Sequence, residues 1–238
     1  MRINQYLARC GVCSRRAADN LINTGVVAVD GAVATLGMDV NESSIVTVNN
    51  ERITLPSKYV VLAYNKPVGV TCSEKDVHAK RLVTREIQSD RRLTYAGRLD
   101  KDSEGLLIMT DDGELINSMM KGANFHEKEY VVTVNKSLND NDLAQMAAGV
   151  FLKELEVRTR PCSIEKVSDS TFRIVLTQGL NRQIRRMCEA YNYEVTSLKR
   201  VRIMNVTLGN LQVGASRELS EEELKELYKR CKLPQYKN

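Results

Sequence analysis

The segment with the clearest chemical potential is residues 97–106, a charged loop bounded by two glycines. Its sequence, Gly-Arg-Leu-Asp-Lys-Asp-Ser-Glu-Gly-Leu, places five charged side chains of both signs within seven residues. The loop runs directly into the apolar residues 106–109, which predict a buried strand. Because a loop that enters such a strand is held against a rigid core, it is a favourable position for a functional site. The alternative is a solvated turn whose charges keep an edge of the sheet soluble.

The order of residues in this loop resembles a known catalytic motif. Residues 97–100, followed by Ser103 and by residues 105–106, resemble the catalytic motif of the pseudouridine synthases. The resemblance is to the branch that modifies single uridines in ribosomal RNA, and it implies that Asp100 is the nucleophile. Ser103 stands where many relatives carry threonine, and both residues supply a hydroxyl.

Two further positions match active-site residues of that family. Tyr130, within residues 127–130, matches the tyrosine that stacks on the target base, and Arg185, within residues 181–187, matches the basic residue that pairs with the aspartate. A fixed guanidinium keeps a half-buried carboxylate ionised and oriented. A tyrosine offers an extruded base a flat apolar face. Either residue alone has an ordinary structural explanation, so the prediction depends on their conjunction with Asp100.

Basic side chains gather in two separate stretches of the chain. Residues 1–20 contain four arginines and one acid, and residues 179–202 form a second basic stretch, whereas acids near the C-terminus dilute the net charge to +5. Cations in the first turn of a helix interact unfavourably with the helix dipole, so Arg15 and Arg16 do not stabilise the helix. Their position therefore indicates a contact with phosphate groups. The resemblance also implies that Lys66, which precedes Pro67, supports the active site. The predicted RNA-binding residues are Arg15, Arg16, Lys66, Arg98, Arg182 and Arg186.

We expect neither a cofactor nor a metal ion. Uridine and pseudouridine are isomers, so the implied reaction needs no redox partner. The Cys10-x-x-Cys13 pair could indicate zinc or a redox motif, but a zinc site needs two more ligands. No second cysteine pair exists, and His78 and His126 stand apart. Small buried side chains at a helix–turn–helix junction are the favoured interpretation.

The first part of the chain predicts a small RNA-binding domain. Apolar spacing predicts a helix over residues 3–10, and Ser14 is a good N-cap for a second helix that ends at Gly25. Strands at residues 26–29 and 45–48 follow, the first of them entering a hairpin turn. The stretches 11–19 and 25–31 resemble an RNA-binding domain known from a small-subunit ribosomal protein.

The rest of the chain predicts an α+β domain on a mixed, largely antiparallel sheet, since strands run in series with irregularly inserted helices. The predicted domains are residues 1–49, a linker at 50–57, and a catalytic domain at 58–238. Expected strands lie at 60–64, 106–109, 129–134, between 155 and 176, and at 197–207. Expected helices lie at 114–120, 140–148, 181–191 and after a capping box of Ser220 and Glu223. Residues 78–92 are predicted as a mobile loop.

The resemblance implies isomerisation of uridine to pseudouridine in ribosomal RNA, after the uridine has been flipped out of its stack. Residues 124–136 and 177–206 are most similar to a group of synthases that act on large-subunit ribosomal RNA, some members of which also modify a transfer RNA anticodon. Leu180 and the pair Asn181-Arg182 depart from the family pattern, which bears on the RNA that is bound. Whether Asp100 attacks the sugar or the base stays open.

Two alternatives are a small-subunit ribosomal RNA synthase and a catalytically inactive RNA-binding or ribosome-assembly protein. Intact Asp100, Tyr130 and Arg185 argue against the second. No stretch approaches the ~18 apolar residues of a membrane span, and residues 1–4 open no signal peptide. We therefore expect a monomeric cytoplasmic protein that contacts no membrane.

Overall fold

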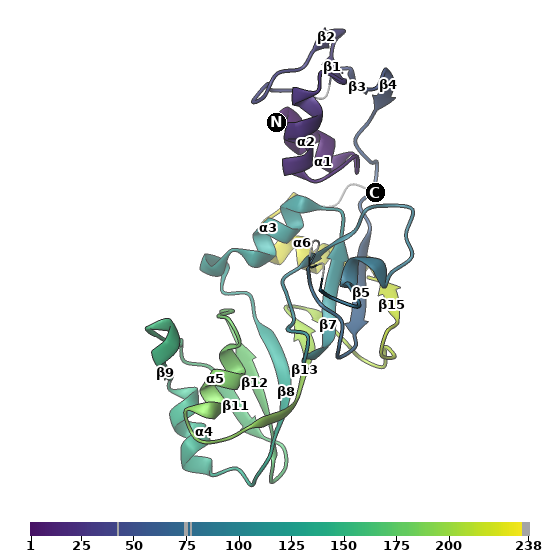
Figure 1. The fold of residues 1–238 in the computed structure, drawn as a ribbon. Helices are drawn as coiled ribbons and strands as arrows, with labels where there is room; N and C mark the ends of the chain where they lie inside the picture. The colour runs from purple at the N-terminus through teal and green to yellow at the C-terminus, as the bar shows by residue number, and fades with distance from the viewer. Residues whose placement is uncertain (42, 74–75, 77, 235–238) are drawn as a thin grey trace.

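The computed structural model describes residues 1–41, 43–73, 76 and 78–234. A small N-terminal domain, purple in Figure 1, lies at one end of a larger domain built on an extended sheet. The larger domain combines segregated helices with a mixed sheet, so the predicted α+β class is confirmed.

The N-terminal domain consists of two helices packed on a four-stranded sheet with the order β2-β1-β3-β4. The Oγ atom of Ser14 accepts a hydrogen bond from the N–H of Ala17, so the predicted N-cap is confirmed. Asp30 and Gly31 have positive φ angles and join β1 to β2, as the hairpin prediction requires. The elements are α1 (Ile3–Arg9), α2 (Arg15–Asn23), β1 (Val27–Val29), β2 (Ala32–Val33), β3 (Val46–Val48) and β4 (Glu51–Ile53).

Strand β4 corrects the predicted linker. It pairs with β3 in antiparallel register, whereas the sequence predicts residues 50–57 as a connection between the domains. Asn49 and Asn50 both have positive φ angles and form the tight turn between the two strands. Because β4 is short and largely exposed, it carries no apolar alternation that would predict a strand.

The two domains meet at Arg9 of α1. Its Nη1 atom lies 3.0 Å from Oε1 of Glu114, at the start of α3 (Gly113–Met120). Its Nε atom donates a hydrogen bond of 2.9 Å to the Tyr59 hydroxyl. A basic residue of the N-terminal domain is therefore used to hold the larger domain.

The larger domain is organised by a nine-stranded sheet whose main path is β11-β12-β8-β13-β7-β5-β15, with β14 on β13 and β6 on β7. Among the described strands of this sheet, β13 and β7 are parallel and the other pairs are antiparallel. The strands are β5 (Val61–Lys66), β6 (Thr94–Ala96), β7 (Glu104–Thr110), β8 (Lys128–Val134), β11 (Ser163–Lys166), β12 (Thr171–Leu176), β13 (Val195–Ile203), β14 (Val206–Thr207) and β15 (Ser216–Glu218).

Helices cover the two halves of this sheet separately. Helices α3 and α6 lie on the half of the sheet near the N-terminal domain, whereas helices α4 and α5 lie against the half that is farther from it (Figure 1). Each half has its own apolar core, one around β8 and β12 and one around β5 and β7. The remaining elements are α4 (Asp140–Ala147), α5 (Gln183–Glu189), α6 (Glu221–Arg230), the small strands β9 (Phe151–Leu152) and β10 (Val157–Arg158), and the 3₁₀ turns η1 (Val83–Arg85), η2 (Gly122–Asn124) and η3 (Lys153–Leu155).

Two predictions about single segments are wrong in part. Residues 197–207 form a hairpin instead of one strand, because Met204 adopts a positive φ and turns the chain between β13 and β14. Residues 78–92 are not simply a loop, because Leu82 and Val83 are buried against the sheet. No helix in the described part of the chain is both long and apolar enough to cross a membrane.

Candidate active site

The charged loop identified in the sequence connects β6 to β7. Gly97 opens it with a φ of +86°, and the N–H of Ser103 donates to the carbonyl of Asp100, which closes a tight turn. Leu99 is buried and fixes the middle of the loop, whereas Arg98 before it is exposed. The loop therefore has a defined conformation that presents Asp100 at a constant place.

The side chain of Arg200, on β13, fixes the position of the loop. Gly105 pairs with Arg200 across the parallel strands, and a Cβ atom at Gly105 would lie 2.3 Å from the Arg200 carbonyl oxygen. The Arg200 side chain is 1% exposed. Its Nε atom donates to the carbonyl of Leu106 at 2.7 Å, and its Nη1 atom donates to that of Arg98 at 3.3 Å. Arg200 thus ties the two ends of the loop together.

A cavity of about 580 Å³ lies above this arrangement. Its walls come from the catalytic loop, from the segment between α3 and β8, from the segment between β12 and α5, and from β13. Asp100 and Tyr130 both line it, although Asp100 lies in the loop, Tyr130 lies on β8, and the two are thirty residues apart. The structure therefore places two of the three predicted catalytic residues in one cavity.

The predicted ion pair between Arg185 and Asp100 is wrong. The Nε atom of Arg185 lies 3.3 Å from Oδ2 of Asp102, and its Nη2 atom donates to the Asp102 carbonyl at 2.9 Å. Among the described residues, the cation that pairs with the Asp100 carboxylate is Arg182, with 3.8 Å between Nη1 and Oδ2. Helix α5 begins at Gln183, with Arg182 as its N-cap residue. Arg182 contacts both Asp100 and Asp102, whereas Arg185, within the helix, contacts Asp102.

Asp102 is the charged centre on which both arginines converge. Burial raises the pKa of its carboxyl, but hydrogen bonds from Arg182 and the charges of Arg185 and Arg182 outweigh burial. The net result is a pKa below the usual value, so Asp102 stays ionised at neutral pH. Sequence spacing alone does not show which carboxylate of the loop pairs with which arginine, and in the structure Arg182 lies near both, at 3.8 Å from Asp100 and 3.1 Å from Asp102.

The contacts of Arg185 lead to a prediction. Arg185→Lys keeps the charge but loses the planar fork that donates to the carbonyls of Asp102 and Val195. Turnover at saturating RNA is expected to fall by about 10-fold or more, because the loop loses its support. Affinity and its salt dependence should stay near those of wild type. Single-turnover rates and salt titrations measure both quantities.

The control is Arg186→Lys on the same helix, because Arg186 pairs with Glu154 and does not contact the loop. It should turn over normally once saturated. Normal turnover by Arg185→Lys at saturation would contradict the positioning role.

The prediction that Lys66 contacts RNA is wrong. Its side chain is fully buried, and its Nζ atom donates to the carbonyls of Pro67 and Val70 at 2.9 and 2.8 Å. Burial lowers the pKa of this ammonium group. Lys66 therefore shapes the loop after β5 instead of meeting a ligand at the surface.

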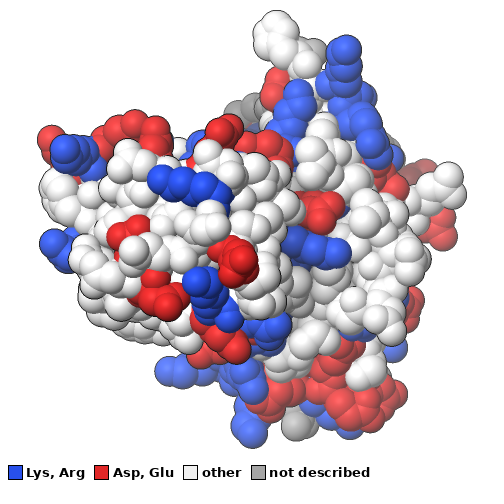
Figure 2. Space-filling model, turned by 90° about the horizontal axis from the view of Figure 1, so that it is seen from below, with Lys and Arg blue, Asp and Glu red and all other residues white. Residues whose placement is uncertain are grey.

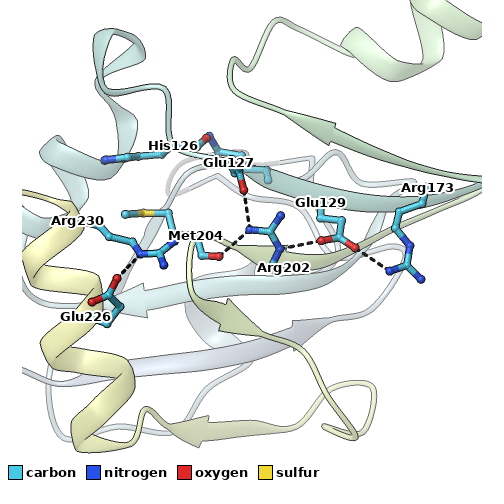
Figure 3. Close-up of polar contacts among 9 residues, drawn as sticks. His126, Glu127, Glu129, Arg173, Arg202, Met204, Glu226 and Arg230 are labelled. Carbon is cyan, nitrogen blue, oxygen red and sulfur yellow. Dashed lines mark hydrogen bonds and ion pairs between the residues drawn. The ribbon is translucent and has the colours of Figure 1, made fainter. Parts of the chain in front are cut away.

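The predicted RNA-contacting arginines differ in their exposure to solvent. Arg15, Arg16, Arg98 and Arg182 are exposed, whereas Arg186 is half-buried. In the second basic stretch, Arg202 is paired with Glu127 and Glu129 at 3.0 and 2.7 Å, as Figure 3 shows. On the face in Figure 2, basic and acidic side chains are interspersed.

Sequence reasoning missed Lys128 and Arg160, which also line the cavity. The Arg160 guanidinium lies 4.0 Å from the ring centroid of Phe125, an exposed aromatic residue. The sequence carries no signal for this contact, because the two residues are far apart in the chain. Lys128 lies two residues before Tyr130 on β8, and alternation along a strand would have placed both on one face.

The cysteines of the N-terminal domain belong to its core. Cys10 and Cys13 are free thiols packed against the apolar residues of the domain. Burial raises the pKa of Cys10 to about 11, so its thiol stays protonated at neutral pH. Within the described ranges, no group of His, Cys, Asp and Glu side chains is arranged to hold a metal ion.

Comparison with known proteins gives matches to both domains. A family profile described as RNA pseudouridylate synthase matches residues 60–190, and one described as S4 domain matches residues 1–46. The dual-specificity RNA pseudouridine synthase RluF of Shigella flexneri is 43% identical over 231 residues, which cover 96% of this chain and 79% of that protein.

Two further matches extend over nearly full lengths. An uncharacterized RNA pseudouridine synthase of Aquifex aeolicus is 36% identical, covering 95% of this chain and 96% of the other. A crystal structure of a pseudouridylate synthase superposes with a TM-score of 0.71 at 26% identity, covering 95% of this chain and 99% of that one. The similarity therefore extends over both domains.

Proposed function

Because this chain belongs to the RNA pseudouridylate synthase family, we propose that it isomerises uridine to pseudouridine in ribosomal RNA, mainly of the large subunit. The observation that supports this most strongly is the cavity shared by Asp100 and Tyr130. A relative whose name records dual specificity, at 43% identity, favours transfer RNA as a second substrate. The small-subunit substrate and the inactive RNA-binding protein are the competing assignments.

Asp100 is the nucleophile of this mechanism. Its carboxylate attacks C1′ of the ribose, and the bond between C1′ and N1 breaks with its electron pair on uracil. The uracil turns in the cavity and C5 bonds to C1′, which releases the carboxylate. The proton on C5 leaves and N1 gains one, so the product is an isomer of the substrate. Arg182 orients the carboxylate, and Tyr130 supplies a flat face for the base.

The target uridine must leave its stack before it can enter the cavity. Pockets for small molecules span about 300–1,000 Å³, so the cavity is large enough for an extruded base. Extrusion costs a few kcal/mol, which contacts between basic side chains and RNA phosphates offset. We propose that the protein acts as a monomer, in the cytoplasm where its RNA is found.

Arg15 and Arg16 are expected to contact RNA phosphates. Both are exposed at the N-terminus of α2, where free N–H groups add to their charge. The double variant Arg15→Gln/Arg16→Gln should bind RNA more weakly, and its log–log salt slope should shrink by about 1.4–1.8. Turnover at saturating RNA should stay unchanged.

The matched control is Arg2→Gln in the same domain, since Arg2 is also exposed but is paired with Asp39 at 3.1 Å. It should leave the salt slope close to that of wild type. A double variant with the wild-type slope would show that α2 does not face RNA.

The function itself is tested with the purified protein and unmodified transcripts of large-subunit RNA, small-subunit RNA and transfer RNA. Pseudouridine mapping should find a single major site in the large-subunit transcript and a weaker one in transfer RNA. A site confined to the small-subunit transcript would favour that alternative. Absence of pseudouridine in all three transcripts would favour the inactive protein.

A further inference from the structure

Arg200 and Lys128 are two of the cavity cations that have no carboxylate partner in the described part of the chain. Arg200 uses Nε and Nη1 to hold the catalytic loop, but its buried Nη2 atom has no hydrogen-bond partner among the described residues. The Nζ atom of Lys128 donates to the carbonyl of His126 at 3.3 Å. Since unpaired buried charge is costly, a fold retains it where a ligand supplies the missing partner.

The excess of positive charge in the cavity also favours a ligand that partners these cations. Its described lining contains a single acidic side chain, Asp100, and six basic ones: Arg98, Lys121, Lys128, Arg160, Arg182 and Arg200. Of these, Arg200 is buried and Lys128 is half-buried, and burial together with the charge of Arg200 lowers the pKa of Lys128 to about 8. The two groups therefore repel each other until an electron-rich group lies between them.

The proposed reaction forms such a group. When the bond between C1′ and N1 breaks, uracil keeps the electron pair and its negative charge spreads over O2 and O4. Asp100 is at that moment a neutral ester of C1′. The cavity then holds an anionic base, no carboxylate charge in its described lining, and two desolvated cations.

We propose that Lys128 and Arg200 donate hydrogen bonds to the carbonyl oxygens of the departing uracil and stabilise its anion while it turns. This inference rests on the proposed function. It assigns Lys128 and Arg200 a role like that of an oxyanion hole, in which fixed donors meet charge that develops during the reaction. The electron pair returns when C5 bonds to C1′, so the cations are needed only between the two bond changes.

The substitution Lys128→Met tests the role of the ammonium group, because it keeps the apolar stem and removes the charge. Consumption of the nucleoside at the site, which begins with cleavage of the bond between C1′ and N1, is followed under single-turnover conditions in RNA that carries either uridine or 5-fluorouridine there. 5-Fluorouridine has no proton on C5, so its reaction stops after C5 bonds to C1′, and its consumption still reports the bond cleavage. Fluorine stabilises the uracil anion by itself. The variant should therefore be slower than wild type by about 100-fold on uridine and about 10-fold on 5-fluorouridine.

The control is Lys166→Met. Lys166 is also a strand lysine whose Nζ donates to a backbone carbonyl, that of Leu138, but it lies on β11 away from the cavity. Its rate should match wild type on both RNAs. Circular dichroism and RNA affinity establish that both variants are folded and bind.

A pH profile gives an independent readout. The charge of Arg200 on β13 acts on Lys128, and the other charged side chains that line the cavity with it are Asp100, Arg98, Lys121, Arg160 and Arg182. With a pKa of about 8, the ammonium form is present below that pH and is lost above it. The wild-type single-turnover rate should fall above about pH 8, and Lys128→Arg should remove that fall because arginine stays charged.

The possible outcomes distinguish a failure of the proposed function from a failure of the proposed role of Lys128 and Arg200. If wild-type protein converts neither RNA, the proposed function fails. If wild type is active and Lys128→Met slows both RNAs by the same factor, or not at all, the stabilisation of the uracil anion is overturned. A larger effect on uridine than on 5-fluorouridine supports it. A wild-type rate that rises above pH 8 would overturn it, since Lys128 would then act as a base.

Discussion

Asp100→Asn is expected to abolish isomerisation while leaving RNA affinity within about twofold of wild type. Asparagine has nearly the shape of aspartate, and among the described residues the Asp100 side chain makes a single ion pair, with Arg182. The fold and the RNA surface should therefore persist, whereas the nucleophile is lost. We expect the single-turnover rate to fall by at least about 10⁴-fold. Pseudouridine quantification in a saturated transcript measures the rate.

Asp102→Asn provides the comparison. Asp102 is the better-paired carboxylate of the loop, since both Arg182 and Arg185 converge on it. Its loss should loosen the loop and slow turnover without abolishing it. If Asp102→Asn were inactive and Asp100→Asn retained turnover above background, the nucleophile would be Asp102 and the assignment of Asp100 would be wrong.

Gly105→Ala is expected to be the most destabilising single substitution that we consider. The added Cβ would lie 2.3 Å from the carbonyl oxygen of Arg200 and 2.7 Å from its nitrogen, both of them backbone atoms that cannot rotate away. Gly105 also has a φ of +107°, which alanine adopts only with strain. Backbone strain alone costs about 1–3 kcal/mol. Since folded domains are stable by about 5–15 kcal/mol, the added overlap should leave little folded protein.

Gly113→Ala is the control, because Gly113 lies in α3, has no positive φ and has no atom near its would-be Cβ. Its free energy of unfolding should stay within about 1 kcal/mol of wild type, since alanine is favoured in a helix. Denaturant midpoints measure both variants. A Gly105→Ala protein with the wild-type midpoint would show that β7 and β13 do not approach as closely as the structure has them.

Local patterns were sufficient to predict most elements. The helix of residues 3–9 follows from apolar residues at helical spacing, and the start of α6 follows from Ser220 and Glu223, which form the predicted capping box. The mixed, largely antiparallel sheet followed from strands in series. These features depend on neighbours in the chain, which a single sequence contains.

Features that depend on distant pairing were harder to predict. The parallel contact between β7 and β13 joins residues about ninety-five positions apart, and no local pattern specifies it. It buries Arg200, which by composition alone belongs with the exposed basic stretch 179–202. Lys66 is buried for the same reason, as the sheet covers a strand end that looks solvated in the sequence.

In the candidate site too, local motifs could be predicted from the sequence, whereas contacts between distant residues could not. Asp100 and Tyr130 were found from motifs, and their shared cavity accords with that prediction. The exchange of partners between Arg182 and Arg185 could not be foreseen, since it depends on where α5 begins relative to the loop. Lys128 and Arg200 escaped notice because their significance lies in burial without a partner, a property of packing.

The measurement that tests the central claim most directly is pseudouridine mapping of total RNA from cells that express either wild-type protein or Asp100→Asn from the native gene. The account predicts a large-subunit ribosomal RNA site that is modified with wild type and unmodified with Asp100→Asn, at equal protein levels. Identical pseudouridine maps from the two strains would contradict it, because neither the reaction nor its nucleophile would then be as proposed.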